Sequence, residues 1–276
     1  MHILRIAISA VFAASCSPLV DAPVNPPAAA ARTVRAAPEP ARPEETAALH
    51  PVASTRFLRV TLSGVWFEGV VFDARRQRLA VVEQEGTPGR RFPDAESAAR
   101  SMGGIAAVNG GFFTPAGEPL GLVMAGGRRF GAWNSASSLG SGVWHADGAG
   151  RMAISRRQAL GSARAMAMQE LLQAGPLLVE SGRAVGGLEN TRTSARTMIL
   201  WDGGQRWWIG RAAPCTLARC ADILATSSPA GWPVAHALNL DGGRSSELWV
   251  SEKISGGPWK SRPLWNRPVR NFLVLE

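Results

Sequence analysis

Short apolar runs bounded by glycine, serine and aspartate recur along the chain from residue 55 onward, a pattern typical of β-strands joined by turns. Strands are predicted in TRFLRVTL (55–62), SGVWFEGVVFD (63–73) and RLAVVEQ (78–84), with a Ser-Gly turn between the first two. Further strands are predicted in GIAAVNGGFF (104–113), GLVMAGGRRF (121–130) and VRNFLVLE (269–276), and hairpins in PLLVESGRAV (176–185) and RTMILWDGGQRWWIG (196–210).

Helical patterns are fewer. DAESAARSM (94–102) predicts a short helix with Asp94 as its N-cap, and ARAMAMQELLQAG (163–175) is helical by residue content. TLARCADIL (216–224) predicts a helix capped by Thr216, with Cys220 on its apolar face. Because strands outnumber helices without alternating strictly with them, residues 51–276 are predicted to form a single α+β domain on a mixed, mostly antiparallel sheet.

The first 50 residues do not fit this domain. Residues 1–16 carry Arg5, an apolar stretch too short to span a bilayer, and the ending AASC, which together indicate a secretory signal. The ending also resembles a bacterial lipobox with Cys16 as the lipid-anchored residue, and ordinary cleavage nearby is the alternative. Residues 17–50 are rich in Pro, Ala and Glu and are predicted to be a disordered tether. The protein is therefore expected to be exported to the periplasm or cell envelope.

The net charge of +9 comes almost entirely from arginine. The arginines are scattered, and neither a basic stripe nor a nucleic-acid-binding module is recognisable, so a nucleic-acid partner is not expected. The charge is compatible with an anionic partner such as a phosphate ester or an envelope polymer. Only four histidines occur and none has the spacing of zinc ligands. Cys215 and Cys220 could form a local disulfide in an oxidising compartment, or Cys220 could be a core residue.

Three apolar runs end in the same type of corner, at Asn109, Asp202 and Asp241, each followed by two glycines. A hairpin turn explains any one of them, because glycine reaches positive φ without steric cost. Asp202 has strong strand formers on both sides and is predicted to be a plain hairpin. Asn109 and Asp241 instead follow almost entirely apolar strands, and such strand ends are rigid places on which to build a site.

Arg196 and Thr197 add a further candidate. A guanidinium can bind a phosphate with two hydrogen bonds and the threonine hydroxyl can add another, although a surface ion pair would equally explain the arginine. Glu247 is a candidate second carboxylate, with a solvated strand residue as the alternative.

Six stretches, taken in order, resemble the phosphodiester glycosidase family over roughly residues 55–276. They are VNGGFF (108–113), QAGPLLVESG (173–182), ARTMI (195–199), TLARCADIL (216–224), LNLDGGRSSEL (238–248) and NRPVRNFLV (266–274). One departure is Arg244, which stands where the family usually has a third glycine; it could add a phosphate contact or narrow the pocket.

The resemblance implies an exported hydrolase that cleaves a sugar-1-phosphodiester at the anomeric carbon of an envelope or extracellular glycan or glycolipid. A phosphodiester leaves as a stable anion, so the site needs fewer carboxylates than an ordinary glycosidase. On this basis Asp241 is expected to be the nucleophile or general base, Arg196 the phosphate clamp, and Asn109 an orienting donor. Substrate contacts are expected from Gly110, Gly111, Thr197, Asn239, Gly242, Gly243, Arg244, Ser245 and Ser246.

Two alternatives remain open at this point: a non-catalytic envelope protein that binds anionic glycans, and a transferase of exopolysaccharide processing. No cofactor is firmly expected. Asp241, Asn239 and Asn109 are nonetheless oxygen ligands of the kind that Ca²⁺ or Mg²⁺ accepts, so a divalent cation is a further option.

Overall fold

The computed structural model describes residues 54–276, which belong to one compact unit beginning at His50. The predicted signal (1–16), Cys16 and the tether (17–50) lie outside the described residues. Every pairing between neighbouring strands within the three sheets is antiparallel. The α+β prediction, with mostly antiparallel sheet and few helices, is confirmed.

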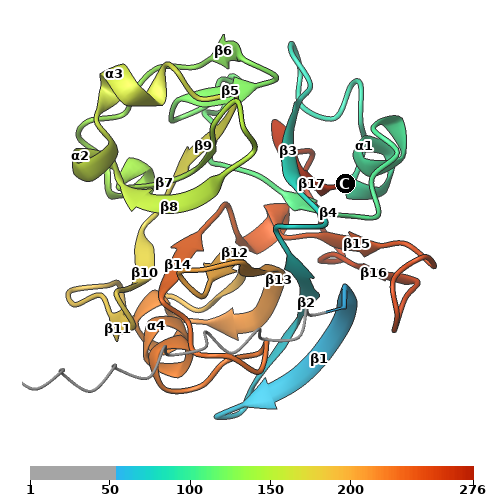
Figure 1. The fold of residues 1–276 in the computed structure, drawn as a ribbon, viewed down its shortest axis with the longest axis vertical. Coiled ribbons are helices and arrows are strands. Elements are labelled where there is room, and N and C mark those ends of the chain that lie inside the picture. Colours follow the sequence, from blue (N-terminus) through green and yellow to red (C-terminus); the bar gives the residue numbers. More distant parts are fainter. Residues whose placement is uncertain (1–53) are drawn as a thin grey trace, which may run out of the picture. The chain divides into compact units, whose positions relative to one another are not determined.

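The largest sheet has seven strands and carries one helix on its outer face (Figure 1). That helix, α4 (Leu217–Thr226), is capped by the Thr216 hydroxyl, which accepts a hydrogen bond from the N–H of Arg219. The strands, in spatial order, are β1 (Arg56–Leu62), β2 (Val65–Asp73), β13 (Arg206–Cys215), β12 (Ser194–Trp201), β14 (His236–Asn239), β10 (Leu177–Glu180) and β11 (Arg183–Ala184).

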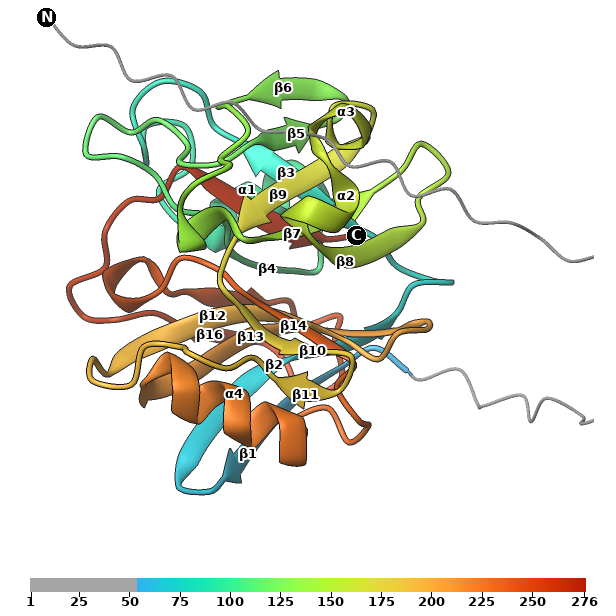
Figure 2. The same ribbon diagram turned by 90° about the vertical axis from the view of Figure 1, so that its left-hand side faces the viewer.

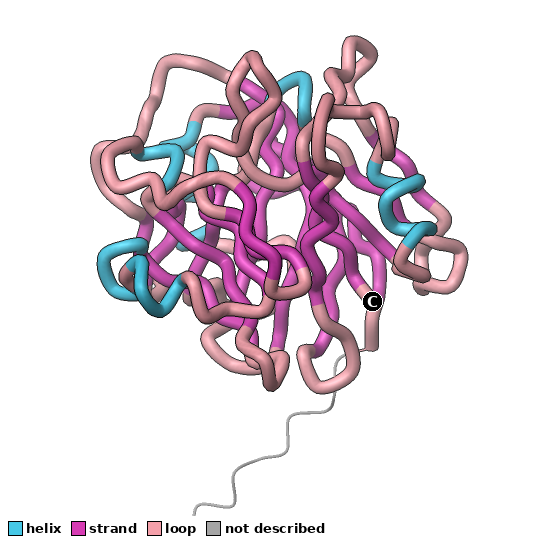
Figure 3. Tube along the Cα trace, turned by 90° about the horizontal axis from the view of Figure 1, so that it is seen from above, coloured by secondary structure: helices cyan, strands magenta, loops and turns pink. Residues whose placement is uncertain are grey.

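Two five-stranded sheets lie beyond the other face of this sheet, one with one short helix beside it and the other with two (Figures 1 and 2). One contains β16 (Trp259–Ser261), β15 (Leu248–Val250), β4 (Ala106–Asn109), β17 (Asn271–Leu275) and β3 (Leu79–Glu83), with helix α1 (Ala95–Ser101) beside it. The other contains β6 (Arg128–Phe130), β5 (Val123–Ala125), β9 (Glu170–Ala174), β7 (Gly142–Ala146) and β8 (Met152–Arg156), with α2 (Arg157–Leu160) and α3 (Ser162–Ala165). Figure 3 shows the strands of all three gathered at the centre, with the helices toward the outside.

One secondary-structure prediction is wrong. Residues 163–175 do not form a continuous helix, because α3 ends at Ala165 and Glu170–Ala174 is strand β9, between β5 and β7. Leu171, Leu172 and Ala174 are fully buried there. Burial against two neighbouring strands outweighs the helix propensity of Ala, Met, Glu and Leu, which amounts to tenths of a kcal/mol per residue.

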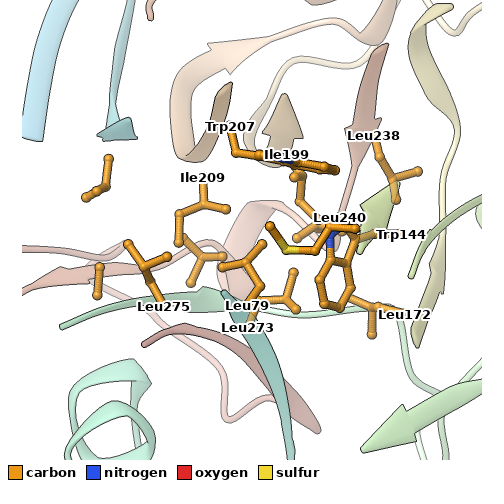
Figure 4. Close-up of a cluster of buried hydrophobic side chains, with 14 of the residues drawn as sticks. Leu79, Trp144, Leu172, Ile199, Trp207, Ile209, Leu238, Leu240, Leu273 and Leu275 are labelled. Carbon is orange, nitrogen blue, oxygen red and sulfur yellow. The ribbon is translucent and has the colours of Figure 1, made fainter. Parts of the chain in front are cut away.

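The main core is shared by all three sheets (Figure 4). Ile199 and Leu238 enter it from the large sheet, Leu273 from the second sheet and Leu172 from the third. Leu240, just after β14, is also fully buried in this core. The next residue, Asp241, is only partly buried, so the chain reaches the edge of the core there.

The described cysteines are unpaired. Cys215 and Cys220 are both free and buried, and Cys220 lies on the inner face of α4, as the helical pattern predicts. No helix of the described residues is long and apolar enough to cross a membrane.

Candidate active site

The Asn109 and Asp241 corners meet, although they come from different sheets. β4 lies between β15 and β17, and β14 lies between β12 and β10, so each corner follows an interior strand. The Asn109 side-chain Nδ2 donates a hydrogen bond of 2.7 Å to the Asp241 carbonyl, and the N–H of Asp241 donates to the Gly110 carbonyl at 3.1 Å. The two predicted site corners are therefore joined directly.

Asp241 lines a cleft of about 670 Å³. Its walls come from the loop after β11, the start of β12, the start of α4 and the short helix η1 (Ser138–Gly140). The lining residues are Phe112, Ser138, Leu139, Pro176, Gly187, Leu188, Glu189, Arg192, Thr193, Ser194, Arg196, Leu217, Asn239, Leu240, Asp241 and Gly242.

The Asp241 carboxylate is only partly satisfied by the protein. Its Oδ1 accepts a hydrogen bond of 2.9 Å from the N–H of Gly242, whereas its buried Oδ2 has no hydrogen-bond partner among the described residues. The Arg267 guanidinium lies 4.0 Å from Oδ2. Burial raises the pKa of Asp241, and the nearby Ser245 hydroxyl and the Arg267 charge oppose that rise. One oxygen of this carboxylate is thus left without a hydrogen-bond partner among the described residues.

Asn239, which also lines the cleft, contains a second buried acceptor that is unsatisfied. Its Nδ2 donates to the Gly175 carbonyl at 2.9 Å, which fixes the amide, and its buried Oδ1 has no partner in the described chain. Leaving a buried polar atom unpaired costs on the order of 1–3 kcal/mol, so such atoms at a cleft are typical of ligand contacts. Asn239 and Asp241 together suit a ligand that donates hydrogen bonds, such as a sugar with free hydroxyls.

Arg196 lines the cleft and is held by two carbonyls. Its Nε donates to the Cys215 carbonyl and its Nη2 to the Arg192 carbonyl, each at 2.9 Å. Glu189 lies 4.0 Å from Nη2, so the cationic charge is partly balanced. The sequence left open whether Arg196 is a surface ion-pairing residue; its side chain is only 11% exposed and faces the cleft.

Glu189 is the other carboxylate of the cleft lining, and it is held ionised. Its Oε1 accepts hydrogen bonds from the Thr191 hydroxyl at 2.6 Å and from the Arg192 N–H at 2.6 Å. These bonds, led by that of the Thr191 hydroxyl, lower the pKa of Glu189 to about 2. Glu189 therefore carries no proton to donate at neutral pH.

Asn109 and Thr197 lie behind the cleft. Asn109 Oδ1 accepts from the Thr197 hydroxyl at 2.7 Å and from the Glu247 N–H at 3.1 Å, and Asn109 is fully buried. The Thr197 hydroxyl lies 2.9 Å from Ser246 Oγ, which also accepts from Arg211 Nε. In this structure the predicted contacts Asn109, Thr197 and Ser246 hold three chain segments together, and none lines the cleft.

The backbone N–H groups of Gly110 and Gly111 are also engaged within the protein. They donate to the carbonyl and to the side-chain Oδ1 of Asn271, each at 2.8 Å. Asn271 in turn donates to the buried Glu83 carboxylate at 3.1 Å, and Arg270 pairs with the same carboxylate. A side chain at Gly110 would collide with Asn271, which explains glycine at this position.

The remaining predicted contacts lie along the turn after Asp241. Gly242 lines the cleft, and Gly243 has φ of +58° at the start of η2 (Gly243–Ser245). Ser245 is buried and donates its N–H to the Gly242 carbonyl. Arg244 is exposed and its Nε donates to the Trp265 carbonyl at 2.9 Å, so it holds a neighbouring loop in this structure.

Sequence reasoning assigned no role to Arg267, Glu189 or Asn271. Two of them, Arg267 and Asn271, lie in the NRPVRNFLV stretch, but only the structure shows that Arg267 lies 4.0 Å from Asp241 and that Asn271 accepts from the N–H groups of Gly110 and Gly111. The alternative of a solvated strand residue at Glu247 is wrong, because Glu247 is 3% exposed. Glu247 does not line the cleft. Burial raises the pKa of Glu247 to about 7; the nearby Asp94 charge adds to this rise, and a hydrogen bond from the Ala95 backbone opposes it.

The Asp202 corner is the predicted hairpin. It joins β12 to β13, and Asp202 Oδ1 accepts from the N–H groups of Gly204 and Arg206, at 2.7 and 3.1 Å. Its Oδ2 forms a 2.6 Å ion pair with Arg206, so both oxygens stabilise the turn itself. This is a clear contrast with Asp241, whose Oδ2 is unsatisfied.

Within residues 54–276, no group of three or more His, Cys, Asp or Glu side chains is placed to hold a metal ion. Of the three oxygen ligands suggested by the sequence, Asp241 and Asn239 face the cleft and Asn109 does not. A Ca²⁺ or Mg²⁺ ion therefore stays a prediction.

The chain belongs to the phosphodiester glycosidase family, whose model matches residues 102–276. No curated protein sequence is significantly similar to it.

Solved structures agree on the fold. The catalytic domain of zebrafish N-acetylglucosamine-1-phosphodiester alpha-N-acetylglucosaminidase, auto-inhibited by its pro-peptide, is similar with a TM-score of 0.55 and 18% identity, covering 83% of this chain and 85% of that one. A hypothetical protein from Synechocystis has a TM-score of 0.53 and 18% identity, covering 80% of this chain and 61% of that one. A protein from Burkholderia pseudomallei whose name marks it as exported has a TM-score of 0.52 and 14% identity, covering 76% and 74%.

Proposed function

We infer that the protein is an exported hydrolase that cleaves a sugar-1-phosphodiester at the anomeric carbon, in a glycan or glycolipid of the envelope. The observation that carries this proposal is the makeup of the cleft: one carboxylate with an unsatisfied oxygen, Asp241, and a guanidinium that lines the same cleft, Arg196. The family supports glycosidase chemistry, and the predicted signal and the exported relative support the location.

The two carboxylates that line the cleft in the described part of the chain, Asp241 and Glu189, favour a leaving group that needs no proton. An ordinary glycosidase protonates the departing alkoxide with one carboxylic acid while a second carboxylate attacks or activates water. Here the other carboxylate of the cleft, Glu189, stays ionised because its pKa is about 2. A phosphate monoester dianion leaves without protonation, so one carboxylate and a cationic clamp suffice.

In the proposed reaction, the bond between the anomeric carbon and the phosphate oxygen breaks, and its electron pair stays on the phosphate. Asp241 Oδ2 either attacks the anomeric carbon, forming a glycosyl-enzyme that water then cleaves to restore the carboxylate, or removes a proton from a water that attacks directly. In both cases the water oxygen ends on the sugar. Arg196 neutralises charge on the departing phosphate, and Asn239 Oδ1 accepts a sugar hydroxyl. The products are the free sugar and a phosphomonoester.

The first test compares the same substitution at two Asp-Gly-Gly corners, Asp241 in the cleft and Asp202 in the hairpin. Asp241→Asn should lower kcat at least a thousandfold toward a panel of sugar-1-phosphodiesters while leaving substrate binding measurable. Asp202→Asn, at the hairpin with the same Asp-Gly-Gly sequence, should leave kcat within twofold. Full hydrolysis by Asp241→Asn would disprove the role of Asp241; binding by both proteins without any turnover would favour a glycan-binding protein.

The second test addresses the clamp. Arg196→Ala should raise KM for a sugar phosphodiester more than for a phosphate-free aryl glycoside of the same sugar. Arg206→Ala is the control, since Arg206 pairs with Asp202 away from the cleft. Equal effects of Arg196→Ala on both substrates would remove its role in phosphate binding.

A further inference from the structure

Two neighbouring apolar side chains project from the loop between β16 and β17. Leu264 is 98% exposed and Trp265 is 80% exposed. The other large hydrophobic side chains exposed in the described part of the chain are Trp66, Met102 and Met166, none above 45%. Exposing an adjacent Leu and Trp has a cost in water, so such a pair indicates an interaction surface.

The base of this loop is fixed while its tip is free. The Asn266 N–H donates to the Pro263 carbonyl at 3.1 Å, which closes a turn around the two side chains. Arg244 donates its Nε to the Trp265 carbonyl and accepts the Arg267 N–H on its own carbonyl, each at 2.9 Å. The backbone behind the tip is therefore held in place, so little ordering is needed when the tip binds a partner.

The residues around the tip are basic. Arg262 and Arg267 flank it in the sequence with side chains 42% and 46% exposed, and Arg244 lies beside it. Their nearest carboxylates are Asp94, 3.8 Å from Arg262, and Asp241, 4.0 Å from Arg267. A Trp-Leu pair ringed by arginines fits a bilayer surface, where indole lies at headgroup depth, Leu enters the acyl boundary and guanidinium groups meet phosphates.

We propose that the loop 262–267 docks the domain onto an anionic phospholipid bilayer through Leu264 and Trp265. A glycan chain is the less suitable partner for the tip, because stacking on a sugar uses the indole and gives Leu264 no contact. Arg267 connects the tip to Asp241, so docking places the cleft next to the lipid headgroups. If the proposed hydrolase function holds, its substrate is then a sugar phosphodiester carried by a membrane lipid.

The test is co-sedimentation of residues 50–276 with lipid vesicles. This segment contains every strand and helix of the compact unit and lacks the predicted signal and Cys16, either of which could bind lipid by itself. Vesicles of phosphatidylethanolamine and phosphatidylglycerol in equal parts should bind the wild-type domain, and phosphatidylcholine vesicles should bind it less. The double variant Leu264→Ser, Trp265→Ser should lower the partition coefficient roughly tenfold or more.

The controls distinguish vesicle binding by the tip from nonspecific binding by other exposed apolar residues and from catalysis. Met102→Ser with Met166→Ser removes exposed apolar groups elsewhere and should leave vesicle binding within twofold. Arg262→Gln should weaken binding to the anionic vesicles about fivefold. Asp241→Asn should bind vesicles like the wild type, so the docking result does not depend on the hydrolase proposal.

Failure of the wild-type domain to bind anionic vesicles would overturn the proposal, and so would equal binding by the Leu264/Trp265 double variant. Retention on an immobilised oligosaccharide through Trp265, without vesicle binding, would assign the tip to glycan and also overturn it. Circular dichroism and thermal unfolding of each variant verify that the differences do not come from misfolding.

Discussion

Asn109 supports Asp241 from behind by donating its side-chain amide to the Asp241 carbonyl at 2.7 Å, across two different sheets. The other end of the same amide accepts from the Thr197 hydroxyl and the Glu247 N–H. One buried side chain thus joins the ends of β4 and β14 to β12. It explains how Asp241 can keep an unsatisfied oxygen, because its own backbone N–H and carbonyl are held by Gly110 and Asn109, and only Oδ1 of its carboxylate is engaged, by the Gly242 N–H.

This relationship predicts a strong effect of Asn109→Leu, which keeps the branching and the number of side-chain heavy atoms but removes every hydrogen bond of the amide. The buried partners left unpaired should lower the free energy of unfolding by about 2–4 kcal/mol, and kcat should fall with it. Thr197→Val removes one of these bonds and should cost about 1 kcal/mol. Urea unfolding and kcat measured on both variants check this; an equal, small loss in both would contradict a central position of Asn109.

Arg267 predicts a shift in the pH dependence of activity. Asp241 must be ionised to attack or to take a proton, so the rate should fall as pH drops through its pKa. Burial raises that pKa and the Arg267 charge lowers it. Arg267→Gln should therefore move the acid limb of the kcat/KM profile to higher pH, while Arg267→Lys should move it less. An unchanged acid limb in Arg267→Gln would mean that Asp241 does not control it.

Much of the fold was predictable because local patterns and tertiary packing agree. The predicted strands, the Thr216 cap and the Asp202 hairpin form as expected, since their turn residues and apolar runs point to the same structure. Strand β9 was not predictable, because its local propensity favours helix and only its two neighbouring strands decide otherwise.

The candidate site was predictable in its centre and not in its surroundings. The corners at Asn109 and Asp241 could be distinguished from Asp202 by the residues that flank them. The sequence could not show which predicted residues face the cleft. Asn239 lines it and Asn109 and Thr197 do not, and this difference depends on the direction of each side chain in the folded protein. Arg267 and Asn271 reach the site through long-range contacts without a local signal, Arg267 with Asp241 and Asn271 with Gly111.

Gly242 predicts a steric effect at the cleft floor. A methyl group there would lie 2.5 Å from the Ala195 carbonyl oxygen, which belongs to the backbone of β12 and has little room to move. Gly242→Ala should therefore destabilise the protein by about 1–3 kcal/mol and displace Asp241, lowering kcat. Gly148→Ala, where a methyl group would meet open space, is the matched control and should leave both stability and kcat unchanged.

Glu247 predicts that stability falls as pH rises toward neutrality. Burial, with a smaller contribution from Asp94, raises its folded-state pKa to about 7 from the ordinary 4.5. Between these pH values the folded protein holds a proton that the unfolded chain releases, so unfolding becomes easier as pH increases. The loss attributable to Glu247 should reach at most roughly 3 kcal/mol above pH 7.

Glu247→Gln removes this titration and should flatten the pH dependence of the unfolding free energy over that interval. Glu252→Gln is the control, because Glu252 is exposed and a hydrogen bond from its own backbone N–H to its carboxylate lowers its pKa. Urea unfolding of the three proteins across this pH range measures the difference. If the unfolding free energies of wild type and Glu247→Gln depend on pH in the same way over this interval, the pKa of Glu247 is not raised in the folded protein and the prediction is wrong.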